Sequence, residues 1–336
     1  MENFNIRRMP ELMKGKQIVY VHGFASSGSS GTVERLRTLM PNATVTAPDL
    51  PIHPAEAMDE LRQLCASLRP NLIVGTSMGG MYAEMLHGYD RILVNPAFQM
   101  ADTMREHGMI GLQQFKSPRA DGATSFIVNK ALVKEYRTVT DQCFSQLDDA
   151  ERQHVWGLFG DEDTTVHTFD IFASHYPHRA ISFHGEHRLN DKTLVNAVMP
   201  VIRWIDDSQE HRSRPIIYVS IDALRAPDGS QMSSALKAFR ILSERYSMFI
   251  VAPSPDYDSD NYTDGVRQWA REVINVPCFG HLVYTNYKSL LYGDYLIDPA
   301  LDSDTRAFTG TRIPFGDDTF KTWEEIIEYF GRLGGQ

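Results

Sequence analysis

The stretch Gly75-Thr76-Ser77-Met78-Gly79 constrains the fold of this chain more than any other. It follows an apolar run at 71–74 that is typical of a buried strand, and it precedes a segment of helical composition at 81–86. A sharp strand-to-helix turn fits this order, because the two glycines leave room for the adjoining strand and helix. Such a turn exposes the serine hydroxyl near a helix N-terminus, where negative charge is favoured. We therefore expect Ser77 to be a nucleophile.

Size and composition exclude several classes of protein. The 336 residues exceed the usual length of one domain, so two domains are expected. A net charge of −10 disfavours a nucleic-acid partner. Cys65, Cys143 and Cys278 are far apart in sequence and odd in number, which is typical of a reducing compartment. Residues 1–8 lack the apolar core of a signal peptide, and no apolar run approaches the ~18 residues of a membrane span. We expect a cytoplasmic protein with no membrane partner.

Short strands alternate with helices through the first half of the chain. Strands are predicted at 17–21, 43–50, 71–76, 91–97, 154–159 and 179–183, and helices include 32–40 and 55–68. This alternation predicts an α/β fold with a mostly parallel sheet and helices on both faces. Ligands bind such sheets beyond the carboxyl ends of the strands, where Ser77 would lie.

The loop after the first strand begins His22-Gly23-Phe24 and is rich in serine and glycine. The spacing of Gly23 and Gly28 is that of a phosphate-binding loop, but Ser29 stands where that motif needs a lysine. We interpret the loop as part of an oxyanion hole, with the backbone N–H groups of Phe24 and Met78 as donors.

A serine hydroxyl needs an imidazole base, and the base needs a carboxylate to fix its tautomer. The pattern Gly160-x-x-Asp163-x-x-Val166 favours Asp163 as the carboxylate, with Asp161 as the alternative. His187 follows a turn glycine and precedes a helix start, so it is preferred as the base over His184. The histidines between 167 and 187 match no metal-binding pattern, and we expect neither a metal nor a cofactor.

Between 98 and 149 the strand signal disappears, and methionines are frequent. An insertion at this point would overhang Ser77, so a lid or acyl pocket is predicted at about 98–150. The alternative is a surface segment without substrate contact.

Residues 15–205 resemble small bacterial α/β-hydrolase esterases. The matching pieces are His22-Gly23-Phe24, Gly75–Gly80, Asn95-Pro96-Ala97, Gly160–Asp163 and His187. The resemblance implies a serine hydrolase of short acyl esters, sometimes of acyl-CoA, with a small-molecule ester or thioester as substrate. It also implies an acyl-enzyme intermediate on Ser77, with His187 and Asp163 completing a triad.

Residues 215–331 resemble the 5′(3′)-deoxyribonucleotidase branch of the haloacid-dehalogenase superfamily, through Tyr284–Lys288 and Gly293–Asp298. That superfamily forms an aspartyl-phosphate on the first Asp of a D-x-D motif, which here reads Ser220-Ile221-Asp222. The late acidic pair reads Asp298-Pro299. Asp222 and Lys288 are retained, and Ser254 takes the place of the motif serine. Without the two carboxylates Mg²⁺ has few of its preferred ligands, so a pseudo-phosphatase is expected.

The predicted organisation is therefore an esterase-like domain at 1–207, a charged linker at 208–214 and a domain at 215–336 that resembles a nucleotidase. The leading hypothesis is a serine esterase or thioesterase. The alternatives are a Mg²⁺-dependent nucleotidase and a non-catalytic binding protein. The second domain could pack against the first, form a homo-oligomer interface or bind a phosphorylated ligand.

Overall fold

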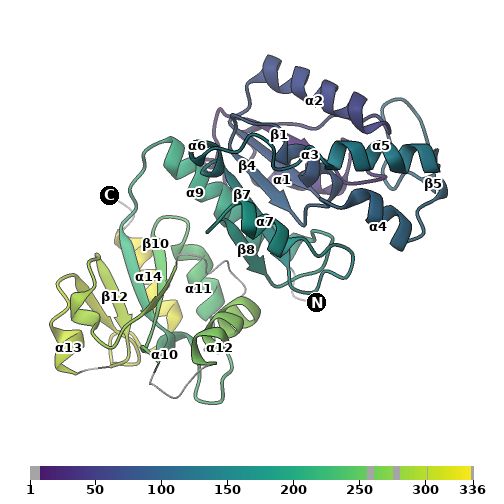
Figure 1. The fold of residues 1–336 in the computed structure, drawn as a ribbon. Helices are drawn as coiled ribbons and strands as arrows, with labels where there is room; N and C mark the ends of the chain where they lie inside the picture. Colours follow the sequence, from purple (N-terminus) through teal and green to yellow (C-terminus); the bar gives the residue numbers. More distant parts are fainter. Residues whose placement is uncertain (1–7, 256–260, 275–280, 301, 334–336) are drawn as a thin grey trace. The chain divides into compact units, whose positions relative to one another are not determined.

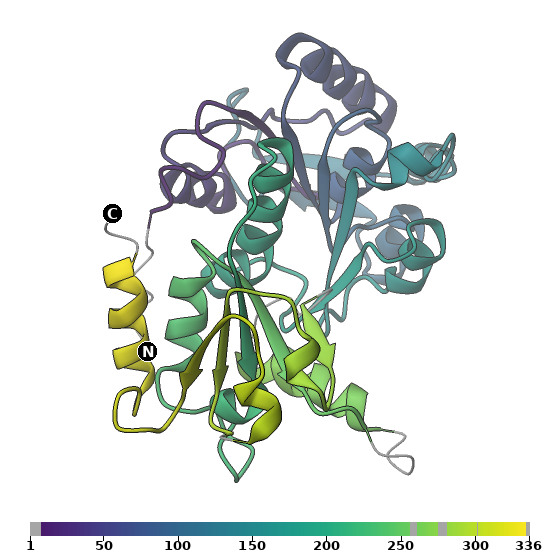
Figure 2. The same ribbon diagram turned by 90° about the vertical axis from the view of Figure 1, so that its left-hand side faces the viewer.

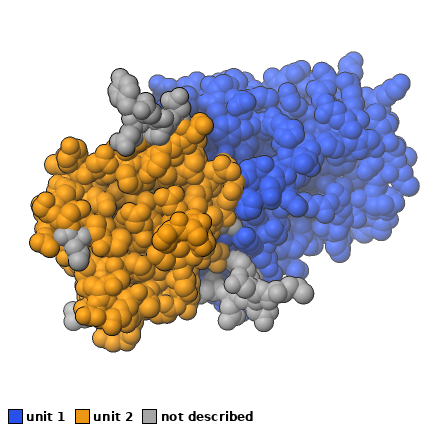
Figure 3. Space-filling model, turned by 90° about the horizontal axis from the view of Figure 1, so that it is seen from below, with its two compact units in different colours: residues 1–210 blue, residues 211–336 orange. Residues whose placement is uncertain are grey.

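The computed structural model describes residues 8–255, 261–274, 281–300 and 302–333. Cys278 and residues 1–7, on which part of the cytoplasmic expectation rests, lie outside these ranges. The chain divides into two compact units, Met1–Glu210 and His211–Gln336, which are coloured separately in Figure 3. Within the described ranges, no helix has both the length and the apolar composition to cross a membrane.

The first unit is built on six parallel strands in the order β2-β1-β3-β4-β7-β8 (Figure 1). The strands are β1 (Gln17–Val21), β2 (Thr44–Thr46), β3 (Leu72–Thr76), β4 (Arg91–Val94), β7 (Val155–Gly160) and β8 (Ala180–Phe183). Every neighbouring pair is parallel, because each connection passes through a helix or a longer segment. The predicted α/β class with a parallel sheet is confirmed.

Helices cover both faces of this sheet. One face packs in a continuous apolar core with α2 (Pro54–Leu68), α3 (Met78–Glu84), α5 (Lys130–Thr140) and α7 (Phe169–His175). The other face is covered by α1 (Gly31–Leu39) and α9 (Met199–Gln209), which bury their own apolar stripes (Figure 1). A short helix α8 (Asp191–Thr193) and a π-helical turn (Leu194–Val198) lead into α9.

A long segment is inserted between β4 and β7. It contains α4 (Met100–Glu106), β5 (Gly111–Gln114), β6 (Ser125–Val128), α5 and α6 (Asp149–Arg152). The expectation that strands are absent here is wrong, because β5 and β6 pair as an antiparallel hairpin. Each strand has four residues and β5 is partly polar, so neither gives a long apolar run. Phe126 and Val128 are buried, whereas Leu112 and Ile127 are exposed.

The charged stretch predicted as the start of the linker belongs to a helix. Helix α9 continues to Gln209, because its polar residues find partners within the first unit. Lys16 contacts Asp206 at 2.7 Å and Glu210 at 2.8 Å, and Gln209 donates to the carbonyl oxygen of Asn71. The two units separate between Glu210 and His211.

The second unit has five parallel strands in the order β11-β10-β9-β12-β13. They are β9 (Ile216–Ser220), β10 (Ser247–Ala252), β11 (Leu282–Tyr284), β12 (Tyr295–Asp298) and β13 (Thr311–Pro314). The helices are α10 (Ile221–Leu224), α11 (Ala235–Leu242), α12 (Tyr262–Trp269), α13 (Ser303–Arg306) and α14 (Trp323–Leu333). A π-helical turn (Ala270–Ile274) follows α12, and a 3₁₀ turn (Lys288–Leu290) precedes β12. Helices α11 and α14 lie side by side over the main core (Figure 2).

The backbone approaches itself very closely around the β3–α3 turn. A Cβ atom at Gly79 would lie 2.0 Å from the carbonyl oxygen of Val21, at the end of β1. A Cβ atom at Gly75 would lie 2.3 Å from the carbonyl oxygen of Gly79. No side chain fits at either position, so these glycines allow β1, β3 and α3 to meet.

We predict that Gly79→Ala destabilises the first unit by about 3 kcal/mol or more, because the clash is with backbone that cannot rotate away. Urea denaturation monitors this loss. Gly31→Ala is the matched control, since a Cβ atom there meets nothing within 4 Å. Equal stability of the two variants would contradict the prediction.

Candidate active site

Ser77 occupies a strained backbone conformation between β3 and α3. Its φ of 55° and ψ of −119° lie in a region that residues with side chains rarely adopt. The turn is held from β4, because the Ser77 N–H donates to Val94 O at 2.9 Å and the Ala97 N–H donates to Ser77 O at 3.0 Å. The hydroxyl is thereby presented at the carboxyl edge of the sheet, as the glycine spacing predicted.

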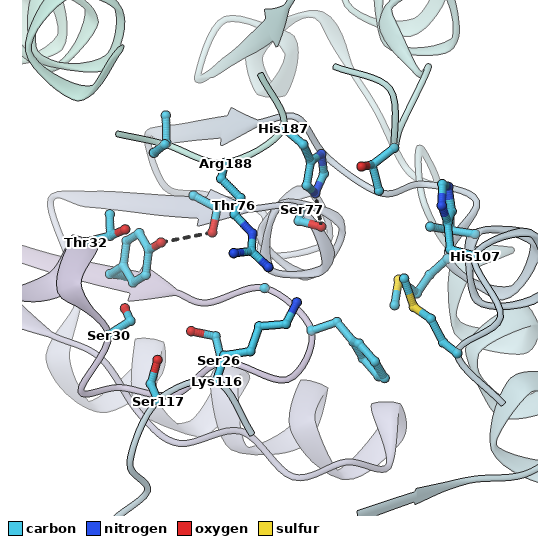
Figure 4. A pocket seen from close by; sticks show the side chains of 18 residues that line it. Ser26, Ser30, Thr32, Thr76, Ser77, His107, Lys116, Ser117, His187 and Arg188 are labelled. Atoms are coloured by element: carbon cyan, nitrogen blue, oxygen red, sulfur yellow. Dashed lines mark hydrogen bonds between the residues drawn. The ribbon is translucent and has the colours of Figure 1, made fainter. Parts of the chain in front are cut away.

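Three side chains form a continuous chain of hydrogen bonds. His187 Nε2 lies 3.0 Å from Ser77 Oγ (Figure 4), and His187 Nδ1 lies 2.7 Å from Asp163 Oδ2. His187 and Asp163 lie in the loops after β8 and β7, so the strand order brings them to Ser77. The alternatives Asp161 and His184 contact each other at 3.3 Å instead.

The environment of Asp163 favours its charged form. Burial raises the pKa of this carboxyl, but the hydrogen bond and charge of His187 outweigh burial, together with two backbone N–H groups. Those groups belong to Thr165 and Val166, at 2.7 and 3.0 Å from Asp163 Oδ1. The net effect holds the pKa of Asp163 below its usual value, so an anion faces His187 at neutral pH.

The two predicted oxyanion donors have no competing acceptor. Across the described residues, neither the Phe24 N–H nor the Met78 N–H has a hydrogen-bond partner. Gly23 brings the first loop against the serine, since a Cβ atom there would lie 3.3 Å from Ser77 Cβ. Both N–H groups are therefore available beside the hydroxyl.

His22 fixes the conformation of this loop. Its Nε2 accepts from the Leu50 N–H at 3.2 Å, so Nδ1 carries the proton and donates to Gly23 O at 2.8 Å. Burial lowers the pKa of His22, which keeps the ring neutral in this arrangement. The sequence pattern His-Gly-Phe thus places a neutral imidazole directly behind the Phe24 donor.

Asn95 is a positioning residue whose role sequence reasoning missed. Its side-chain amide donates to the carbonyl oxygens of Glu186 and His187, both at 3.1 Å, and accepts from the Gly160 N–H at 2.8 Å. Asn95 therefore ties the end of β4 to the loops that carry Asp163 and His187. The sequence shows only an asparagine before a proline at the end of a strand, and this pattern does not indicate which groups the side chain bonds to.

A cavity of about 510 Å³ opens beside Ser77. Its walls come from the loop after β1, the inserted segment and the loop of His187. The inserted segment contributes Met100, Met109 and Lys116 to the lining, whereas Arg188 comes from the loop of His187. Serine hydroxyl groups of the loop after β1 also line the cavity. The predicted lid or acyl pocket at 98–150 thus supplies part of the cavity wall.

One group of described residues has ligand atoms close enough to hold a metal ion. These residues are Asp161, Glu162 and His184, whose ligand atoms lie within 4.8 Å of one another. The two acidic residues are exposed, and Asp161 already accepts from the Gly185 N–H. The hydrogen-bonded chain from Ser77 to Asp163 does not include this group.

The second unit places its predicted site residues at the carboxyl edge of its sheet. Ser220 ends β9, and its buried hydroxyl has no hydrogen-bond partner among the described residues. Lys288 forms an ion pair with Asp298, which ends β12 and is fully buried. The Ser254 N–H donates to Asn286 Oδ1 at 3.0 Å, and Asp222 is exposed on α10.

A family model matches residues 17–185, which is half of the chain and contains Ser77 and Asp163. The chain belongs to the Uncharacterised protein family (UPF0227). A second match covers 40% of this chain and 95% of a protein of Vibrio phage KVP40 named "Putative 5'(3')-deoxyribonucleotidase", at 28% identity over 164 residues. The chain is thus also a distant homologue of that phage protein.

Solved structures that are similar to part of this chain include an esterase domain and a thioesterase domain. The esterase domain of a Rhodothermus marinus protein is 15% identical, with a TM-score of 0.37, and the match covers 61% of this chain and 89% of that domain. A thioesterase domain from the curacin biosynthetic pathway is 15% identical, with a TM-score of 0.31, and the match covers 54% of this chain and 88% of that domain.

We predict that Asn95→Ala destabilises the first unit by about 2 kcal/mol, because the backbone groups of Gly160, Glu186 and His187 lose their hydrogen bonds to this buried amide. The loop of His187 should also lose its position, so Ser77 should react more slowly with a fluorophosphonate probe. Asn129→Ala is the control, because it removes the N-cap of α5, worth about 1 kcal/mol, without touching that loop. An unchanged labelling rate in Asn95→Ala would contradict the positioning role.

Proposed function

We propose that this protein is a serine hydrolase that cleaves small acyl esters or thioesters through an acyl-enzyme. The observation that carries the proposal is the hydrogen-bonded chain Ser77–His187–Asp163, with Ser77 on a strained turn between two unpartnered N–H groups. A serine at a strained turn has little structural use, whereas the strain is understandable if it presents a nucleophile.

The geometry supports the following first half of the reaction. Ser77 Oγ attacks the acyl carbonyl carbon while His187 Nε2 takes the hydroxyl proton. Asp163 stabilises the resulting imidazolium and holds its Nδ1–H in place. The negative charge on the former carbonyl oxygen is stabilised by the N–H groups of Phe24 and Met78. When the tetrahedral intermediate collapses, the bond to the leaving group breaks and His187 gives that group its proton.

The second half repeats these roles with water. His187 removes a proton from a water molecule, whose oxygen attacks the carbonyl carbon of the acyl-enzyme. The second tetrahedral intermediate uses the same two N–H donors. Its collapse breaks the bond to Ser77 Oγ, which recovers the proton from His187, and the carboxylic acid is released. In this proposal the methionines of the inserted segment line the space for a small acyl chain.

The second unit does not support an independent phosphotransferase. The likeness to the phage protein favours this alternative. However, Ser220 offers a hydroxyl in place of the carboxylate that a metal and an aspartyl-phosphate both need. The buried carboxylate of Asp298 is neutralised by Lys288. We propose that this unit is catalytically inactive as a phosphatase.

We predict that Ser77→Ala lowers kcat for p-nitrophenyl butyrate by about 10⁴-fold or more, because the nucleophile is removed. Release of p-nitrophenolate measures the rate, and fluorophosphonate labelling measures the reactivity of the serine. Ser174→Ala is the control, since this exposed hydroxyl only caps the carbonyl oxygen of Ile171. Full activity of the Ser77 variant would refute the proposed function.

We also predict that the protein with Mg²⁺ releases no phosphate from deoxyuridine monophosphate, because Ser220 cannot form an acyl phosphate. A colorimetric assay of inorganic phosphate checks this. Phosphate release that disappears in Asp222→Asn would instead assign phosphatase activity to the second unit.

A further inference from the structure

Two cationic side chains reach the cavity beside Ser77. Lys116 comes from the inserted segment and Arg188 directly follows His187, and Figure 4 shows both side chains extending into the same space from opposite walls. No carboxylate is present among the described residues that line the cavity. Although the chain has a net charge of −10, the charged residues that line this cavity are therefore cationic.

Neither cation has an anionic partner within the described part of the chain. Nearby arginines are neutralised: Arg119 contacts Asp121 at 2.9 Å, and Arg35 contacts Asp191 at 2.7 Å. Lys116 and Arg188 form no comparable ion pair. What distinguishes these two cations is that both lie in one cavity beside Ser77 with no carboxylate in its lining, so their charges are available to a ligand.

Both cations project from backbone that is anchored near the reacting groups. The Lys116 N–H donates to Ala25 O at 2.7 Å, which joins its backbone to the residue after Phe24. Arg188 is adjacent in sequence to His187, whose carbonyl oxygen accepts from the Asn95 amide. The two side chains therefore start from fixed positions close to the predicted oxyanion donors and the imidazole.

The two positive charges repel each other in the absence of a ligand. Burial lowers the pKa of the Lys116 ammonium, and the charge of Arg188 lowers it further. An anion between the two side chains would reverse this unfavourable interaction. Hydroxyl groups beside them add hydrogen-bond donors, and that of Ser30, which is 8% exposed, has no partner among the described residues.

We propose that Lys116 and Arg188 form an anion subsite, which selects acyl esters or thioesters that carry a negatively charged oxyacid group. The inference rests on the proposed hydrolase activity and specifies its substrate class. The anion is either a carboxylate on the acyl chain or a phosphate on the leaving group. Both groups offer the oxygen acceptors that a lysine and an arginine bind.

Matched substrate pairs test the subsite and distinguish the two sources of charge. The carboxylate pair is p-nitrophenyl hydrogen glutarate against p-nitrophenyl pentanoate, which has the same number of acyl carbons. The phosphate pair is butyryl-CoA against butyryl-N-acetylcysteamine, which has the same thioester without phosphates. For each pair, the ratio of kcat/KM for the charged to the neutral substrate is measured at fixed ionic strength.

In the wild-type protein we expect a ratio above one for the pair that carries the physiological anion. Lys116→Met and Arg188→Met should each lower that ratio about tenfold, and the double variant should lower it further. Lys134→Met and Arg332→Met are the controls, since these residues are exposed, as Lys116 and Arg188 are, but do not line the cavity. A ratio that stays at the wild-type value in the double variant, for both pairs, overturns the subsite.

Binding to the Ser77→Ala protein separates this inference from the proposed function. Calorimetry measures the affinity for glutarate and for butyryl-CoA with no turnover. Affinity that weakens about tenfold or more when Lys116→Met and Arg188→Met are added supports the subsite. Equal affinity with and without these two changes refutes it. Absence of hydrolysis in the wild-type protein, by contrast, would refute the hydrolase proposal and leave this binding result intact.

Discussion

The contact between the backbone of Gly79 and the carbonyl oxygen of Val21 determines the arrangement around Ser77. Because no side chain separates them, the end of β1 lies directly against the start of α3. The loop that leaves β1 then passes over Ser77, and His22 locks it there through Leu50 and Gly23. The strained serine and its two neighbouring N–H donors therefore result from one close approach of three elements.

The other half of the site follows from the order of strands. β4, β7 and β8 are adjacent, so the loops that carry Asp163 and His187 emerge side by side at the carboxyl edge. Adjacency alone does not fix the conformation of these loops. Asn95 restrains them, since one buried amide bonds to the end of β7 and to the loop after β8. Rigid positioning of this kind is what a general base needs in order to act on a fixed hydroxyl.

The sequence predicted what depends on local patterns. Glycine spacing identified the turn at Ser77, and the alternation of strands and helices predicted the parallel sheet. Contacts between residues that are distant in the sequence could not be predicted in this way. The partners of Asn95 lie more than 60 residues further along the chain, and Lys116 and Arg188 are 72 positions apart, so no local pattern joins them. The hairpin of β5 and β6 was missed because its strands are short. The end of α9 was interpreted as the start of a linker because it is charged and polar, and the sequence does not show that these residues pair within the first unit.

Aromatic packing against Phe24 connects the inserted segment to the loop that we assign to the oxyanion hole. The ring of Phe24 meets that of Phe126 in an edge-to-face contact at 5.3 Å, and Phe126 also packs on Phe115 at 4.7 Å. The hairpin thus supports, from behind, a residue whose backbone we assign to the oxyanion hole. In the proposed hydrolase, a sequence change that disturbs Phe126 would therefore affect an oxyanion donor as well as the wall of the cavity, which restricts how this segment can diverge.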